Sequence, residues 1–333
     1  MSLTESIKLA GLGLGLDLVG VTSGEAVSVG EREYLRGWLD RDCAGGMPWM
    51  HRNFEKRVNP AVLLVGARSV ICAAAAYGPL PSQPEPGSSA VVSEAAYGRI
   101  ADYARLDDYH VWLKERLFAL ADAISRLAGK RGRFKICVDS APLAERSLAQ
   151  RAGLGFIGRN HMLTNERLGS QLLLGEIVTD LPLDPDAAGE NLCGDCSRCI
   201  QACPTGALRP DGGFDSSRCA SYLTIEHKGT IDPALARLMG NRLFGCDECT
   251  LACPYTRNAP LRAPGGAPFC RSGRLALKEV LAWSEEDFMK HFGNTPMERC
   301  GLDVIRRNAA ICLSNAGCQG KNASSGSPGA SWP

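Results

Sequence analysis

The chain has no long apolar run and no excess charge of either sign. Its longest uninterrupted apolar stretch, residues 70–77, has eight residues, whereas a membrane-spanning helix needs about 20. Lys and Arg total 37 against 36 Asp and Glu, so the total charge indicates neither a nucleic-acid nor a membrane partner. The N-terminus lacks the basic and apolar segments of a secretory signal. We therefore expect a cytoplasmic protein without a membrane partner, and a monomer.

Histidine is scarce, and no two histidines have the spacing of a metal-binding pair. Asp108-Tyr109-His110 is similar to the D-x-H-x-x-G signature of proteins that ligate cobalt through histidine, but Leu113 stands where the glycine should be. The apolar spacing that follows predicts a helix, and we interpret His110 as a residue of that helix. The five histidines are His51, His110, His161, His227 and His291.

Hydrophobic periodicity predicts a mixed α/β region over residues 1–188. Ser140 and Pro142 mark the expected start of one of its helices, and Gly153 marks its end. The order of helix, glycine turn and strand around residues 11–20 is the reverse of a dinucleotide-binding fingerprint. Helices are predicted over 6–14, 107–129 and 140–153, and strands over 16–22, 66–78, 134–140 and 171–183.

Fifteen cysteines in a chain without a secretory signal indicate metal or redox chemistry rather than a disulfide scaffold. Eight of them fall within residues 193–253, so residues 189–262 are predicted to form a separate, ferredoxin-like domain. A breaker-rich segment follows, and residues 263–320 look mostly helical. Residues 321–333 have the composition of a disordered tail.

The first cysteine motif is Cys193-x2-Cys196-x2-Cys199-x3-Cys203-Pro204. In bacterial ferredoxins this spacing holds one 4Fe–4S cluster with three cysteines, while the fourth binds the other cluster. Zinc is the competing metal. A zinc site would need two cysteine pairs, but neither the third close cysteine nor the proline, so we interpret the motif as iron–sulfur.

The second motif, Cys246-x2-Cys249-x3-Cys253-Pro254, is one cysteine short. Two clusters need eight ligands, and the other cysteine of this region, Cys219, is the obvious eighth; the alternative is that Cys219 is a buried free thiol. The crossing rule assigns the first cluster to Cys193, Cys196, Cys199 and Cys253, and the second to Cys203, Cys219, Cys246 and Cys249.

Asp139 stands where a predicted strand passes into a helix, a common place for functional groups in α/β folds. A partly buried acid there can be held protonated and act as a proton donor. The alternative interpretation is an Asx-turn that starts the helix.

Segments along most of the chain resemble those of epoxyqueuosine reductases, in order from about residue 3 to 315. Ferredoxin motifs alone are widespread, but VDSAPLAER (138–146) and RCASYLTIE (218–226) are much more specific. The other matching segments include MPWMHRNFEKRVNP, YGRIADYARLDDYH, AGLGFIGRNHML, MGNRLFGCDECTLACP and RNAAICLSN.

The resemblance implies an oxidoreductase with cobalamin and two 4Fe–4S clusters that reduces epoxyqueuosine in the tRNA anticodon loop to queuosine. It implies a nitroreductase-like N-terminal domain that binds cobalamin without a histidine ligand, and an electron donor that the sequence does not identify. The family's proton donor falls on Asp139, and its extra cluster ligand on Cys219. The matching cobalamin contacts are Arg57, Asp139, Ser221 and Asp247, and the matching tRNA contacts are His227 and Lys228.

Three other functions are compatible with the motifs. A related corrinoid iron–sulfur reductase, such as a dehalogenase, would act on a small molecule. An electron-transfer protein would need little beyond the clusters, and the size of the first domain argues against it. A tRNA-binding module without catalysis would not need the cysteines.

Overall fold

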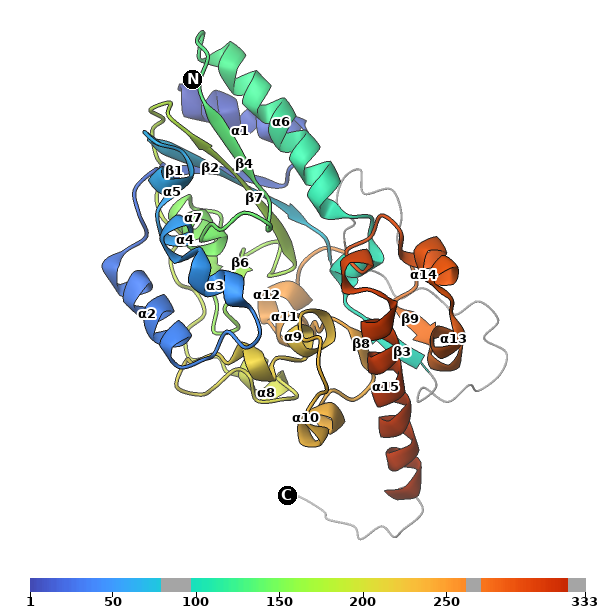
Figure 1. Ribbon diagram of the computed structural model, residues 1–333. Coiled ribbons are helices and arrows are strands. Elements are labelled where there is room, and N and C mark those ends of the chain that lie inside the picture. Colours follow the sequence, from blue (N-terminus) through green and yellow to red (C-terminus); the bar gives the residue numbers. More distant parts are fainter. Residues whose placement is uncertain (79–96, 262–270, 323–333) are drawn as a thin grey trace.

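The computed structural model describes residues 1–78, 97–261 and 271–322 (Figure 1). Its main sheet has four strands in the order β1 (Leu18–Ser23), β2 (Ser69–Ala76), β7 (Leu172–Thr179) and β4 (Phe134–Cys137). All three pairings are antiparallel. Three of these strands lie within segments predicted as strands, and β1 extends one residue past its predicted segment. The mixed α/β character is therefore confirmed, although the sheet is antiparallel.

The apolar run of β2 is explained by its central position, because helices cover both faces of the sheet. All eight residues of β2 are buried. Ile71 and Ala73 pack in one core with α1 (Leu3–Gly13) and α6 (Tyr109–Leu127), whereas Val70 and Cys72 pack in another with α7 (Glu145–Arg151). A strand buried on both faces has no polar alternation.

Helix α6 begins where the sequence predicts, because the Asp108 side chain accepts a hydrogen bond from the backbone of His110 at 3.0 Å. Helix α7 begins later than predicted, at Glu145 instead of near Ser140. The intervening residues form an irregular turn, in which Asp139 has a φ of 49°. This turn holds Asp139 beside the start of α6.

The remaining short helices form two groups. The first group flanks the main sheet on the α7 side, and the second group carries the cysteine motifs. The first group is α2 (Val29–Asp40), α3 (Pro48–Arg52), α4 (Phe54–Val58) and α5 (Pro60–Leu63), with the hairpin β5 (Phe156–Ile157) and β6 (Leu163–Thr164). The second group is α8 (Arg198–Ala202), the 3₁₀ turn η3 (Ser216–Arg218), α9 (Ala220–Ile225), α10 (Pro233–Leu238), α11 (Glu248–Leu251) and α12 (Pro254–Arg257).

A second, three-stranded sheet joins all three predicted regions. Strand β3 (Tyr97–Ile100) pairs in parallel with β8 (Arg242–Phe244) and antiparallel with β9 (Arg274–Ala276). Behind it lies a core shared with the C-terminal helices. These are α13 (Leu277–Ala282), α14 (Glu285–Phe292) and α15 (Leu302–Asn322); the 3₁₀ turns η2 (Asp102–Arg105) and η4 (Glu298–Cys300) lie nearby.

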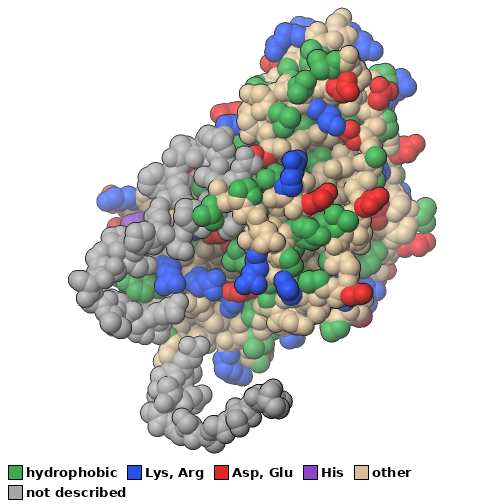
Figure 2. Space-filling model, turned by 180° about the vertical axis from the view of Figure 1, so that it is seen from behind, with side chains coloured by type: hydrophobic (Ala, Val, Ile, Leu, Met, Phe, Trp, Pro, Cys, Tyr) green, Lys and Arg blue, Asp and Glu red, His purple; other side chains and the backbone are tan. Residues whose placement is uncertain are grey.

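The predicted boundary near residue 262, and all but the first two residues of the predicted tail over 321–333, lie outside the described residues. None of the helices described here has both the length and the hydropathy to span a membrane. Figure 2 shows acidic and basic side chains interspersed over one face of the molecule, in line with the balanced composition.

We predict that Gly20→Ala destabilises the protein, because β1 and the end of α7 meet at this glycine. An added Cβ would collide with the carbonyl oxygen of Ala152 and lie 2.7 Å from Leu154 Cδ1. Overpacking of this kind costs about 1–3 kcal/mol, which should lower the thermal midpoint of the cofactor-loaded protein. Gly13→Ala is the matched control, since nothing lies within 4 Å of its added Cβ. Equal midpoints for the two variants would contradict this account of the packing.

Candidate active site

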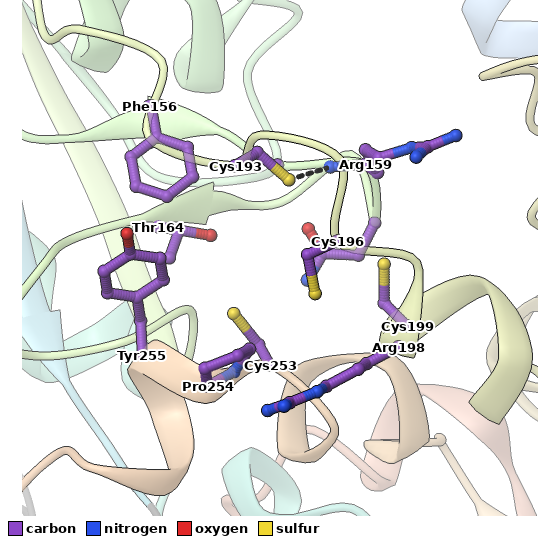
Figure 3. Close-up of a pocket in the computed structure, with 12 residues that line it drawn as sticks. Phe156, Arg159, Thr164, Cys193, Cys196, Arg198, Cys199, Cys253, Pro254 and Tyr255 are labelled. Atoms are coloured by element: carbon purple, nitrogen blue, oxygen red, sulfur yellow. Dashed lines mark hydrogen bonds between the residues drawn. The ribbon is translucent and has the colours of Figure 1, made fainter.

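The structure brings Cys253 together with three cysteines of the first motif. Figure 3 shows the sulfur atoms of Cys193, Cys196, Cys199 and Cys253 around one cavity, with Phe156 and Tyr255 on its wall. Cys199 lies on α8 and Cys253 precedes α12, so two distant segments meet here. No three His, Cys, Asp or Glu side chains of the described residues converge on a single ion position. Thiolates spread around a cavity suit a cluster, which is larger than one zinc ion.

The other four predicted ligands lie at the end of α8 and near the starts of α9 and α11. Cys203 ends α8, Cys219 precedes α9, and Cys246 and Cys249 lie on either side of the start of α11. Burial raises the pKa of Cys249 well above its usual value, and the charges of Cys246, Cys219 and Cys203 add to the shift. Burial likewise raises the pKa of Cys246 to about 11. The charges of Cys203, Cys219 and Cys246 thus act on Cys249, as expected for thiols of one ligand set.

A cavity of about 930 Å³ lies between the N-terminal helices and the segment that precedes Cys219. This volume is near the upper end of the usual range for ligand pockets, about 300–1,000 Å³. Its walls combine aromatic with charged side chains; they include Tyr34, Trp38, Trp49, Arg57, Asp139, Glu145, Arg146 and Glu226. Arg57 Nε is buried without a hydrogen-bond partner in the described part of the chain. A buried donor of this kind suits a polar group of a ligand.

Asp139 lies on the wall of this cavity, and hydrogen bonds fix it on the protein side. Its backbone N–H donates to Glu145 Oε1 at 2.7 Å, and its Oδ2 accepts a hydrogen bond from the Tyr109 hydroxyl at 3.1 Å. The side chain is 60% exposed. The carboxylate is therefore oriented, yet open to a molecule in the cavity.

His110 is the residue whose role the sequence interpretation missed. It lies in the first turn of α6 as predicted, but it is buried, and its Nε2 lies 3.2 Å from Asp139 Oδ2. The hydrogen bond from His110 is the largest cause that lowers the pKa of Asp139 below its usual value. Pairing with His110 thus opposes the protonated form that the sequence interpretation allowed for Asp139, and the side chain is exposed to the cavity.

A second acid, Glu145, has its pKa shifted in the opposite direction. Burial raises the pKa of Glu145, and the charge of Asp139 adds to the shift. Burial thus favours the protonated form of Glu145, whereas the contact with His110 favours the ionised form of Asp139. The segment VDSAPLAER contains both residues, but only the turn before α7 shows that they meet.

The remaining predicted cobalamin contacts, Ser221 and Asp247, lie in the region that carries the cysteine motifs. Asp247 starts α11, and its Oδ2 accepts a hydrogen bond from the backbone N–H of Asp102 at 2.7 Å. Ser221 lies in α9, two residues after Cys219. Arg57 and Asp139 line the large cavity, whereas Ser221 and Asp247 are not among its lining residues.

The predicted tRNA contacts lie in the turn after α9. His227 Nε2 is 2.9 Å from the Thr230 carbonyl oxygen, and Lys228 Nζ donates to the Ile225 and Cys300 carbonyls at 3.3 Å. Arg307 on α15 donates hydrogen bonds to the carbonyl oxygens of His227 at 2.6 Å and Gly229 at 2.8 Å. Helix α15 therefore fixes the shape of this turn.

Comparison with protein families gives two matches. The family described as "4Fe-4S double cluster binding domain" matches residues 192–256, which contain all eight predicted ligands. The family described as "Epoxyqueuosine reductase QueG, DUF1730" matches residues 57–140.

Individual relatives match almost the whole chain. The epoxyqueuosine reductase of Vibrio cholerae is 39% identical over 94% of this chain and 84% of its own length. A crystal structure of epoxyqueuosine reductase with an epoxyqueuosine-modified tRNA-Tyr stem loop superposes with a TM-score of 0.84, at 32% identity, over 94% of this chain and 81% of that one. The Bacillus subtilis enzyme, solved with its catalytic aspartate loop swung out of the active site, gives 0.82 at 31% identity, over 94% of this chain and 82% of that one.

We predict that Cys219→Ala removes the second cluster and leaves the first. Because Cys219 is predicted to complete the ligand set of the second cluster, its loss should reduce bound iron from about eight to about four per chain. Iron and sulfide analysis after anaerobic purification measures this directly. Cys43→Ala, at a buried cysteine outside both groups, is the control and should keep about eight. A full complement of iron in Cys219→Ala would show that this thiol is not a ligand.

Proposed function

The chain belongs to the epoxyqueuosine reductase family, and we propose that it reduces epoxyqueuosine in the tRNA anticodon loop to queuosine with cobalamin and Asp139. The observation that carries the proposal is the large cavity. It lies between Asp139 on one side and the segment leading to Cys219 on the other. An acid and the chain that carries the predicted cluster ligands thus border the same cavity.

Cobalamin fits this cavity by its size and its lining. Aromatic side chains would contact the corrin, and the buried Nε of Arg57 offers an unused donor for its polar substituents. Ser221 and Asp247 lie outside the lining of the cavity, and cobalamin would have to extend beyond it, toward the cysteine motifs, to contact them. When bound, cobalamin would supply a strongly reducing cobalt centre, and the eight cysteines would hold the clusters that relay electrons to it from a donor.

The overall reaction sets what the protein must contribute. Converting an epoxide to an alkene consumes two electrons and two protons, and the oxygen leaves as water. An unprotonated oxygen is a poor leaving group, so a positioned acid accelerates the step by about 10²–10⁴-fold. Asp139 is the proton donor, since its carboxyl group faces the cavity and is held at its other side by Tyr109 and His110.

The tRNA substrate reaches this cavity past the turn that carries His227 and Lys228. Glu226, the residue before them, lines the cavity itself. The exposed Lys228 supplies a positive charge for a phosphate, and Arg307 holds the turn in place. The electron donor is a further partner, which we leave unassigned.

We predict that Asp139→Asn keeps iron and cobalamin but loses turnover by about 10²–10⁴-fold, the usual contribution of a general acid. Asparagine tolerates the positive φ of this position as aspartate does, so the backbone turn survives. The assay follows conversion of epoxyqueuosine to queuosine in modified tRNA by mass spectrometry. Asp122→Asn, on the exposed face of α6, should be fully active. Near-normal conversion by Asp139→Asn would refute the role of Asp139 as the acid.

We also predict that Arg57→Met weakens cobalamin binding by about 10–100-fold, which corresponds to one hydrogen bond from a charged donor. Absorbance titration of cobalamin-free protein gives the dissociation constant without any turnover. Lys56→Met, at the exposed neighbouring position, is the control. Unchanged affinity in Arg57→Met would place the cofactor elsewhere.

A further inference from the structure

We propose that His110, oriented by Asp108, is the residue that supplies Asp139 with protons during turnover. The proposal rests on the proposed function, and its starting point is the proton balance. Each turnover consumes two protons, whereas one carboxyl group can deliver only one before it must be protonated again. A group that replaces this proton must contact the Asp139 carboxylate on the side away from the cavity.

The geometry around His110 meets that requirement. One ring nitrogen, Nδ1, lies 2.6 Å from Asp108 Oδ1, and the other, Nε2, lies 3.2 Å from Asp139 Oδ2. Asp108 also caps α6 through the backbone N–H of His110, so its carboxylate cannot leave the ring without uncapping the helix. An imidazole bound to a carboxylate through Nδ1–H presents Nε2 for proton exchange.

The charged groups that face the ring come from three elements. Asp108 and Tyr109 belong to the start of α6, Asp139 follows β4, and Arg299 belongs to η4. Arg299 Nη1 lies 3.1 Å from His110 Nε2, and its Nη2 donates to Asp108 Oδ2 at 3.1 Å. The guanidinium favours the neutral ring, which prevents the two carboxylates from holding the proton on His110 too tightly.

The direction of proton transfer follows from the two environments. Burial acts to lower the pKa of His110, but hydrogen bonds to Asp108 and Asp139 outweigh it and raise the pKa. The same pairing lowers the pKa of Asp139, so a proton held by the pair lies on the imidazole ring rather than on the carboxylate. When the substrate excludes water from the cavity, the exposed carboxylate loses solvation, and a neutral carboxyl group is favoured. The proton then moves from Nε2 to Oδ2, and His110 recovers a proton from solvent.

Glu145 is the other acid nearby, but it contacts Asp139 through the backbone N–H rather than the carboxylate. Tyr109 donates a hydrogen bond to Asp139 Oδ2, and burial raises the pKa of its phenol. It therefore orients the carboxylate without exchanging its own proton at neutral pH. Among these neighbours, only His110 both contacts the Asp139 carboxylate through its side chain and has an ordinary pKa near neutrality, about 6.5.

The first test is His110→Gln in the cofactor-loaded enzyme. Glutamine can still hydrogen-bond to Asp139 but cannot carry a proton, so kcat should fall about 10²-fold, at the low end of acid–base catalysis, with KM for tRNA unchanged. In the wild type, kcat should decline as the pH rises through the raised pKa of His110, and this decline should be absent in His110→Gln. His291→Gln, an exposed helical histidine stacked on Trp283, is the control and should behave as the wild type.

Two further measurements separate proton supply from simple support of the fold. Imidazole added to His110→Ala should restore part of the lost turnover. In ¹⁵N-histidine NMR of the cluster-loaded protein without cobalamin, the His110 resonance should titrate above the ordinary value, and Asp108→Asn should lower that pKa. An unchanged kcat and pH profile in His110→Gln would overturn the proposal while leaving Asp139 as the acid. Lack of conversion by the wild type would instead overturn the proposed function.

Discussion

The position of Cys253, a residue of the second motif, beside three cysteines of the first motif constrains the rest of this structure. Cys253 lies at the cavity of Cys193, Cys196 and Cys199, so the segments around both motifs must stay together. The second segment begins directly after β8, which pairs with β3 from the N-terminal region. Glu248 strengthens this junction by accepting hydrogen bonds from Arg99 at 2.9 Å and Arg242 at 2.7 Å. A shift of the two cysteine motifs relative to the main sheet would therefore disrupt both the pairing of β8 with β3 and the arrangement of the cysteines.

Hydrogen bonds between side chains and the backbone extend the same junction along the large cavity. Trp38 on α2 donates to the Phe214 carbonyl at 2.7 Å, and the Tyr222 hydroxyl receives the N–H of Gly46 at 2.6 Å. Phe214 also lines the cavity. The walls of the proposed cofactor site thus come from both parts of the chain and depend on their mutual position. This arrangement explains why a separate, freely moving ferredoxin domain would not serve here.

Strong local patterns made part of this fold predictable. The apolar run of β2 and the capped periodic helix α6 were identified because one segment contains their whole signal. Strands β3, β8 and β9 were missed, since three or four residues carry almost no periodicity and their pairing joins distant segments. The cysteine spacing likewise predicted the ligand set, whereas the contact between His110 and Asp139 depends on how α6 packs against the end of β4. The lowered pKa of Asp139 depends on that contact, which no local sequence pattern indicates.

The different exposure of Asp139 and His110 determines when Asp139 can act as an acid. Asp139 is 60% exposed, while the His110 side chain is 6% exposed. With water in the cavity, solvation and the contact with His110 both stabilise the carboxylate, so a proton held by the pair stays on the buried ring. Only an occupant that removes this water favours the neutral carboxyl group. In the proposed function, the acid thus forms when the substrate is in place, which limits the chance that a reduced cofactor meets a proton donor without an epoxide to accept both electrons and protons.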